Sequence, residues 1–198
     1  MFSITRPAAE RIARFLAAQE DAPFSYAEVG ATRDAPPPLY TVDHNRVRLG
    51  SGIDVFDRAA AALRGWRMLT LGWAGVYPQD TAIAPGRTVA VVARHYGFWS
   101  LNACRIVYVV DEAGGADGMR RFGFAYGTLP DHGAVGEERF MIEWRPADDS
   151  VWYDLYAVSR PGHPLARLGY PLVRALQRRF ARASKQAMVS ATADFEVS

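Results

Sequence analysis

The run Val151-Trp-Tyr-Asp-Leu-Tyr-Ala-Val158 is followed by a break at Ser159-Arg-Pro161-Gly162-His-Pro164 and then by a long amphipathic segment. In that segment apolar side chains recur at steps of three and four residues, as on one face of an α-helix: Leu172, Leu176, Phe180, Ala183 and Ala187. Pro171 suits the first turn of such a helix, because its fixed φ and missing N–H cost little there. The sequence therefore predicts a strand, a turn and a helix over about residues 171–189.

Basic side chains follow the same spacing on the opposite face of the predicted helix: Arg174, Arg178, Arg182 and Lys185. The net charge is +2, but the segment between Asp154 and Asp194 contains seven basic residues and no acid. Such a block attracts anionic lipid or nucleic acid, or else it is a solvated helix face. One lysine among 23 basic residues indicates a general arginine bias, which favours the solvated face. We expect no nucleic-acid partner and at most weak contact with an anionic membrane.

Six runs rich in Val, Ile, Tyr, Phe and Trp make up most of the chain after residue 67. Short turn segments separate the runs, which are Met68–Val76, Thr88–Tyr96, Leu101–Val110, Met119–Thr128, Glu137–Trp144 and Val151–Val158. No crossover helix intervenes, so the pattern favours an antiparallel meander over a parallel, doubly wound sheet. A further strand is expected at Phe24–Thr32, and an extended segment at Leu39–Val42 after three prolines.

Two shorter helices are predicted in the first third of the chain. One covers about residues 6–19 with Thr5 as its cap, and the other keeps helical spacing of apolar residues over 54–66. A sheet of about seven strands has a face to cover, and the C-terminal helix offers a single apolar stripe. We therefore predict an α+β helix-grip fold, with a curved antiparallel sheet wrapped on that helix. One domain is expected over residues 1–198, with a disordered tail at about 191–198.

Composition limits the class of protein. At 198 residues and 49% hydrophobic composition, the chain can bury a sizeable core. No apolar run approaches the roughly 20 residues of a membrane span, and the N-terminus lacks a signal-peptide pattern, so a cytoplasmic location is expected. The single cysteine, Cys104, is expected to be a small buried hydrophobic residue. The four histidines lack the spacing of zinc ligands, so we expect neither a metal nor another cofactor.

Alternation along the run Glu137–Trp144 places Glu138 on the same apolar face as Phe140. A carboxyl group on such a face must be paired, hydrogen-bonded or neutral with a raised pKa. Glu138 is therefore a candidate for the polar end of a cavity between sheet and helix. The alternatives are that Glu138 lies in water at the strand end, or that it bonds to an arginine such as Arg94 or Arg139.

The preceding run has one aromatic face and one almost bare face. Phe124, Tyr126 and Thr128 alternate with small residues, among them Gly127, where we expect the strand to bend. If the aromatic face points inward, Tyr126 and Thr128 place hydroxyl groups near Glu138. Buried tyrosines often need only a structural hydrogen-bond partner, and that alternative stays open.

No Ser/His/Asp set and no nucleophile elbow is recognisable, although residue order alone does not exclude a dispersed triad. His132 with Glu138 is the best acid/base pair that the sequence offers.

The segment Ala125-Tyr-Gly-Thr-Leu-Pro-Asp-His-Gly-Ala-Val-Gly-Glu-Glu-Arg-Phe140 resembles the signature of uncharacterised protein family 0548. Supporting matches are Val29-Gly-Ala-Thr32, Leu49-Gly-Ser-Gly52 and Ser159-Arg-Pro161, so the resemblance spans about residues 26–187. Asp131 and Gly133 replace a more usual Gly and Pro, which alters one turn and leaves the candidate site residues in place. That family is grouped with the START-like, pollen-allergen-like helix-grip superfamily. The resemblance implies an inward cavity for a hydrophobic small molecule or lipid, and superfamily relatives range from carriers to cyclases and dehydratases.

Three hypotheses follow. The first is a carrier of a hydrophobic or aromatic small molecule or lipid. The second is a cyclase or dehydratase that uses Glu138 and His132, and the third is contact with an anionic membrane through the basic helix face. The expected ligand-binding residues are Tyr126, Thr128, His132, Glu138, Phe124, Phe140, Leu172 and Leu176.

Overall fold

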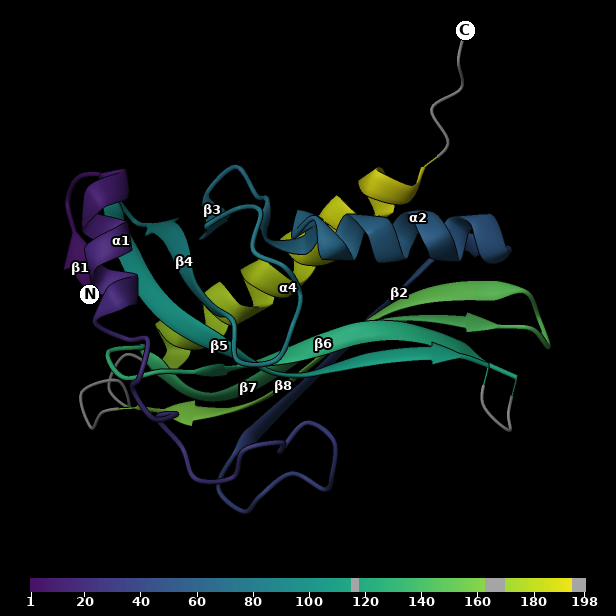
Figure 1. Ribbon diagram of the computed structural model, residues 1–198, viewed down its shortest axis with the longest axis horizontal. Helices are drawn as coiled ribbons and strands as arrows, with labels where there is room; N and C mark the ends of the chain where they lie inside the picture. The colour runs from purple at the N-terminus through teal and green to yellow at the C-terminus, as the bar shows by residue number, and fades with distance from the viewer. Residues whose placement is uncertain (115–117, 163–169, 194–198) are drawn as a thin grey trace, which may run out of the picture.

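The computed structural model describes residues 1–114, 118–162 and 170–193, and the side chains of 170 and 171 lie outside this description. Within these ranges the chain forms one antiparallel sheet, three α-helices and a short 3-10 helix (Figure 1). The elements in order are β1 (Phe2–Ser3), α1 (Ala9–Ala17), β2 (Thr41–Ser51), α2 (Ile53–Arg64), η1 (Arg67–Leu69), β3 (Ala74–Tyr77), β4 (Thr88–His95), β5 (Phe98–Ala113), β6 (Arg120–Thr128), β7 (Ala134–Arg145), β8 (Ser150–Pro161) and α4 (Tyr170–Thr192).

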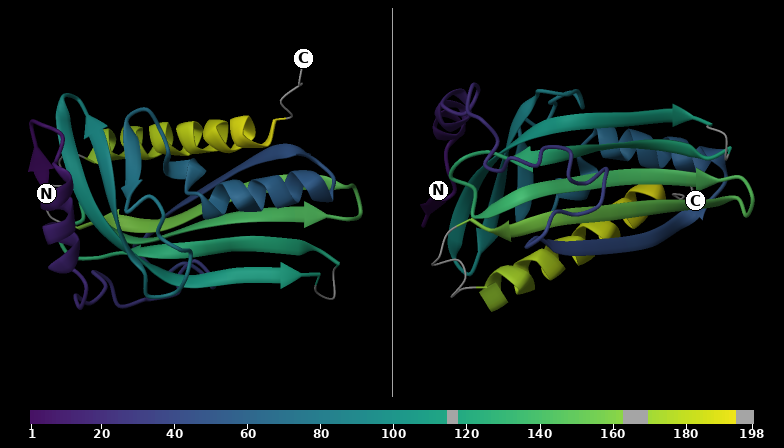
Figure 2. Two further views of the ribbon diagram at one scale, coloured as in Figure 1. Left: turned by 45° about the horizontal axis from the view of Figure 1, so that its top comes forward. Right: turned by 90° about the horizontal axis from the view of Figure 1, so that it is seen from below.

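The strands lie in the order β2-β8-β7-β6-β5-β4-β3, with β1 added beside β5. The sheet curves strongly, and α4 runs across its concave face, with α2 covering the same face at one end (Figure 2). Six consecutive strands, β3 to β8, pair as an antiparallel meander, as predicted. The prediction of an α+β helix-grip fold is confirmed.

The predicted strand Phe24–Thr32 is wrong. This segment forms turns and crosses the outer, convex face of the sheet (Figure 2). Two of its backbone donors bond to a side chain instead of to a neighbouring strand. The N–H groups of Gly30 and Thr32 donate to the carboxylate of Glu137 at 2.8 and 3.1 Å. The bare face of β6 allows this approach, because a Cβ at Gly127 would lie 2.1 Å from the hydroxyl of Tyr26.

Two strand boundaries also differ from the prediction. The run Met68–Val76 contains the end of η1 and the first three residues of the short strand β3. The expected extended segment at Leu39–Val42 is in fact the start of β2, an 11-residue strand that pairs with β8 along its whole length. The length of this strand could not be predicted from apolar alternation, because its polar residues face a hydrogen-bonded outer surface and the polar end of the cavity described below.

The C-terminal helix is rotated relative to the predicted face. Its most buried side chains are Ala181, Ser184, Met188 and Thr192. That face is displaced by about one residue, or roughly 100°, from the predicted stripe, and Leu172 is 49% exposed. Ser184 is fully buried, and its hydroxyl is satisfied there by a hydrogen bond with the hydroxyl of Tyr153 on β8 at 2.8 Å.

Helix ends differ as well. The C-terminal helix continues to Thr192, so residues 191 and 192 do not belong to a tail. The rest of the predicted tail, residues 194–198, lies outside the described residues. The first helix covers Ala9–Ala17, less than the predicted 6–19, and its cap residue is Ala8 instead of Thr5. It packs Ile12 and Phe15 on the outer side of β4 and β5.

Candidate functional site

The concave face of the sheet divides into rows of facing side chains that change in size along the strands. One row runs Asn45, Leu155, Phe140 and Phe124 across β2, β8, β7 and β6, and the next begins at Val47 and contains Tyr153, Ile142 and Phe122. These large side chains pack with α2 into a filled core. On the other side of the Phe140 row, two residues earlier along β7, lies a row of Asp43, Ala157, Glu138 and Tyr126. The next row in the same direction contains Ser159 and Gly136. Small residues here leave space.

That space is a cavity of about 220 Å³ between the sheet and α4. Its apolar wall includes Leu69, Val91, Leu155, Leu176 and Phe180. Polar side chains gather toward the end of the cavity near the start of β7: Asp43, Asn102, Tyr126, His132, Glu138 and Gln177. The cavity is therefore mostly apolar with one polar end, which is typical of small-molecule sites.

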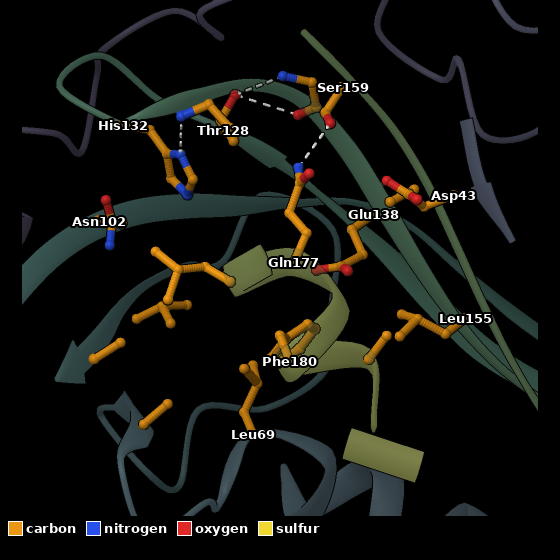
Figure 3. A pocket seen from close by; sticks show the side chains of 18 of the residues that line it. Asp43, Leu69, Asn102, Thr128, His132, Glu138, Leu155, Ser159, Gln177 and Phe180 are labelled. Atoms are coloured by element: carbon orange, nitrogen blue, oxygen red, sulfur yellow. Dashed lines mark hydrogen bonds between the residues drawn. The ribbon is translucent and has the colours of Figure 1, made fainter. Parts of the chain in front are cut away.

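Glu138 is one of the acids at this polar end, and it points from β7 into the cavity toward α4 (Figure 3). The hydroxyl of Tyr126 donates to its Oε2 atom at 2.8 Å. No ion pair joins Glu138 to a basic residue within the described chain, so the alternatives of an Arg94 or Arg139 partner are wrong; Arg139 bonds instead to Asp154 on the outer face at 3.1 Å.

Burial raises the pKa of the Glu138 carboxyl to about 7. The hydrogen bond from Tyr126 acts in the opposite direction, and the negative charge of Asp43 raises the pKa further. Glu138 keeps some accessible surface in spite of this burial, because it borders the cavity. Near neutral pH the group can therefore either donate or accept a proton toward a molecule in the cavity.

Asp43 forms an ion pair with a basic residue of the C-terminal helix. Arg174 of α4 donates through Nη2 to Oδ1 of Asp43 at 2.5 Å and through Nη1 to the other oxygen. Nη1 of Arg174 also donates to the side-chain oxygen of Gln177 at 2.8 Å, and the Gln177 amide donates to the hydroxyl of Ser159 at 3.2 Å. This chain of contacts holds α4 to β2 and β8 beside the polar end.

His132 lines the cavity but does not pair with Glu138. Its Nδ1 atom accepts a hydrogen bond from the N–H of Ala134 at 3.1 Å, so the neutral ring carries its proton on Nε2. Burial lowers the pKa of His132 to about 4. At neutral pH it is a hydrogen-bond donor to the cavity, and no hydrogen bond joins it to Glu138 among the described residues. The expected His132–Glu138 pair is therefore replaced by Tyr126–Glu138.

The other expected residues divide into two groups. Leu176 lines the cavity, and so does Thr128, whose hydroxyl is occupied by the backbone of Gly136 and by Ser25. Phe124 and Phe140 are fully buried beside the cavity and support Tyr126, with ring centroids 6.5 and 5.2 Å from its ring. Leu172 is exposed and does not line the cavity, because the helix is rotated.

The sequence prediction missed Asp43, Asn45, Asn102 and Gln177. Asn102 was within a predicted strand, and its alternation with Cys104 would have placed it on the inner face. The prediction also missed Glu137, which is 2% exposed on the outer face. Nothing in the alternation marks Glu137 as buried, because the segment that covers it comes from over 100 residues earlier in the chain.

The basic face of α4 is smaller than predicted. Arg174 is paired with Asp43, and Nζ of Lys185 lies 3.5 Å from the side-chain oxygen of Asn45. Arg178 and Arg182 are exposed. No three His, Cys, Asp or Glu side chains of the described chain gather as metal ligands would. Its helices also include none that is long and apolar enough to cross a bilayer. Cys104 is a buried free thiol, as predicted.

Comparisons with known proteins identify the family. A family model described as a domain of unknown function, DUF1990, matches residues 25–187. A UPF0548 protein from Deinococcus radiodurans is 39% identical over 204 residues, which cover 96% of this chain and 98% of the relative. This chain belongs to the UPF0548 family. The resemblance of the segment 125–140 to that family is thereby confirmed.

The solved structures that this UPF0548 chain resembles have low sequence identity to it. A hypothetical protein of Helicobacter pylori, jhp0584, has a TM-score of 0.55 and 15% identity, and it covers 82% of this chain and 94% of its own. Human STARD10 has a TM-score of 0.47 and 10% identity, with coverage of 95% and 80%. At these identities the likeness concerns the fold alone, so the chemistry of the UPF0548 cavity has to be argued from its own residues.

Proposed function

We propose that this UPF0548 protein binds a small, mostly apolar molecule that carries one hydrogen-bonding group. The observation that carries the proposal is the Glu138 carboxyl group, which Tyr126 holds at the edge of a cavity with largely apolar walls. Burial of a carboxyl group without a cationic partner costs free energy of folding, and such groups are found most often at functional sites. Ligand pockets combine such an isolated polar group with apolar walls, the first for orientation and the second for affinity.

The cavity sets the size of the ligand. Its volume of about 220 Å³ is below the roughly 300–1,000 Å³ of pockets for drug-sized molecules. A bicyclic aromatic compound or a single short acyl chain suits it better than a whole phospholipid. We infer that the polar group of the ligand contacts Glu138 and Tyr126, while its apolar part lies against Leu69, Leu176 and Phe180.

A cavity-filling substitution tests this function. Ala157 lies directly opposite Glu138 on β8 and lines the cavity, so Ala157→Phe would occupy the space beside the carboxyl group. Ala13→Phe, on the exposed side of α1, is the matched control. Each protein is incubated with an apolar cell extract, repurified and weighed by native mass spectrometry, and its fold is checked by circular dichroism.

Wild type and Ala13→Phe should retain a bound small molecule, and Ala157→Phe should retain none. Equal retention by the folded Ala157→Phe variant, or no retained molecule in wild type, would remove the basis for the proposal.

A second candidate function is acid/base catalysis on the same ligand, and the pKa of Glu138 favours it. A carboxyl group with a pKa of about 7 can donate and accept protons at neutral pH, whereas ordinary glutamates are already ionised. Tyr126 would orient the group, and His132 would donate a hydrogen bond from Nε2 rather than act as the base. The retained molecule is incubated with wild type and with Glu138→Gln. A mass change with wild type alone supports catalysis, and an unchanged mass with both supports a carrier.

A further inference from the structure

The concave wall of the cavity continues outward into an exposed apolar rim. Ala93 and His95 of β4 line the cavity, and their partners across the ladder are Ser100 and Phe98 of β5, which lie on the same face. Phe2 of β1 pairs with Ser100 on the other side. Phe98 is 55% exposed and Phe2 is 71% exposed, so the inner face of the sheet ends in open aromatic side chains.

Two further side chains complete this rim. Tyr96, 67% exposed, belongs to the two-residue turn between β4 and β5, in which Tyr96 and Gly97 both have positive φ, at 49° and 89°. Such turns match the twist of the flanking strands, and they place Tyr96 at the tip of the hairpin. Ile4, 80% exposed, follows β1 by one residue. We call Phe2, Ile4, Tyr96 and Phe98 the apolar rim.

The rim adjoins the mouth of the cavity. The ring of His95, the residue before the turn, lies 5.7 Å from that of Trp73, and both residues line the cavity. The guanidinium carbon of Arg179 on α4 lies 4.3 Å from the centre of the Trp73 ring. The β4–β5 turn and the first half of α4 therefore lie at the same end of the molecule (Figure 2).

Exposed arginines surround the rim. Arg94, two residues before Tyr96, pairs with Trp99 on the opposite face of the β4–β5 hairpin, and the guanidinium carbon of Arg6 lies 5.7 Å from the centre of the same Trp99 ring. Arg178 and Arg179 are exposed on α4 beside the mouth. Asp131 is an acid at this end, where its charge acts on the N-terminal amino group.

We propose that the apolar rim inserts into the headgroup region of an anionic lipid bilayer, with the mouth of the cavity facing the membrane. Scattered single apolar residues need no explanation, but a projecting group of three aromatic residues and an isoleucine is typical of an interfacial contact. The surrounding positive charge is complementary to anionic headgroups, each arginine adding to the attraction. The role of the bilayer as the source or destination of an apolar ligand rests on the proposed function; the docking itself does not.

The test is sedimentation of the full chain with vesicles of phosphatidylcholine, with and without phosphatidylserine. Phe2→Ser with Phe98→Ser removes apolar contact, and Arg94→Glu reverses one charge. The matched controls are Leu39→Ser, an apolar side chain that is 94% exposed elsewhere, and Arg48→Glu, an exposed arginine near the far end of β2.

Wild type should bind the vesicles that contain phosphatidylserine. The double serine variant and Arg94→Glu should each bind them about tenfold more weakly. High salt should weaken binding of wild type, because it screens the arginines. Both controls should bind as wild type does. Absence of wild-type binding, equal binding to vesicles without phosphatidylserine, or an equal loss in the controls overturns the proposal.

A parallel assay without vesicles separates the two proposals. The rim residues do not line the cavity, so the double serine variant should retain a small molecule from the apolar extract as wild type does. Vesicle binding without any retained molecule would leave the rim standing and contradict the carrier function. A retained molecule without vesicle binding would leave the carrier function standing and contradict the membrane contact of the rim.

Discussion

Tyr126 and Glu138 occupy directly opposite positions on β6 and β7, and the tyrosine hydroxyl donates to the carboxyl group at 2.8 Å. The neighbouring positions in the same row are Ala157 and Asp43, so the carboxyl group has a small side chain on one side and a tyrosine on the other. Arg174, the cation beside this row, donates to Asp43 and forms no ion pair with Glu138 among the described residues. Glu138 is thus an acid held in place within an apolar cavity, and its titration and its neighbours are open to direct measurement.

Glu138 should contribute a stabilisation that falls as pH rises through neutrality. Its pKa is about 7 when folded, against 4.5 for an ordinary glutamate, so the folded state binds more protons than the unfolded state between these values. The stabilisation is fully present below about pH 4.5 and lost above about pH 7, which amounts to about 3 kcal/mol. Urea unfolding from pH 4 to 8 gives the free energy of unfolding of wild type and of Glu138→Gln. Over this range the value for wild type should fall by that amount relative to the value for Glu138→Gln. A difference independent of pH would show that Glu138 titrates normally.

Tyr126→Phe should move that titration upward. The hydrogen bond from Tyr126 lowers the pKa of Glu138, so its removal favours the neutral carboxyl group. Carbon-13 NMR of the labelled glutamate side chains would give a midpoint above that of wild type. Tyr156→Phe, on the outer face of β8, should leave the midpoint unchanged; an equal shift in that control would assign the effect to general loosening.

Substitution of the neighbouring Glu137 should destabilise the protein. Glu137 is 2% exposed and accepts hydrogen bonds from Tyr26, Gly30 and Thr32, which hold the segment 24–32 on the outer face. In Glu137→Gln one carboxyl oxygen becomes an amide donor, so a buried donor loses its acceptor, at a cost of about 1–3 kcal/mol. Urea unfolding at pH 7 should show this loss for Glu137→Gln, whereas Glu138→Gln should show no loss, because its neutral amide replaces a carboxyl group whose stabilisation is already fading at that pH. Equal losses would mean that the outer-face contacts are not the source.

Gly136 should tolerate no side chain. It has φ of +147°, and a Cβ there would lie 2.0 Å from the backbone oxygen of Val158. Gly136→Ala is therefore expected to destabilise the protein by about 3 kcal/mol or more. Gly72→Ala is the control, because nothing lies within 4 Å of its Cβ position. Thermal melting should lower the midpoint for the first variant alone.

The meander was predictable because its strands have two different faces. Runs such as Met119–Thr128 and Glu137–Trp144 alternate between side chains of the inner core and those of the outer face, and this period of two decides both strand and register. It also placed Glu138 and Tyr126 on one face, which the structure shows to be the face of the cavity.

The remaining features depended on contacts distant in sequence. Phe24–Thr32 has strand-like composition because Phe24 and Tyr26 pack on the outer face, but the carboxylate of Glu137 takes the backbone donors that a ladder would use. The helix face was displaced because small residues, Ala181 and Ser184, pack closest to the sheet, while Leu172 is exposed. Hydrophobicity alone favours the leucines in such a case.

The central claim is that the cavity beside Glu138 binds one small apolar molecule, and a fluorescence titration with 2-naphthol tests it most directly. This probe has a bicyclic apolar body and one hydroxyl group, and naphthalene is the same body without the hydroxyl. Wild type should bind 2-naphthol saturably at one site and naphthalene about tenfold more weakly, and Ala157→Phe should bind neither. Absence of saturable binding in wild type, or unchanged binding in Ala157→Phe, would contradict the account.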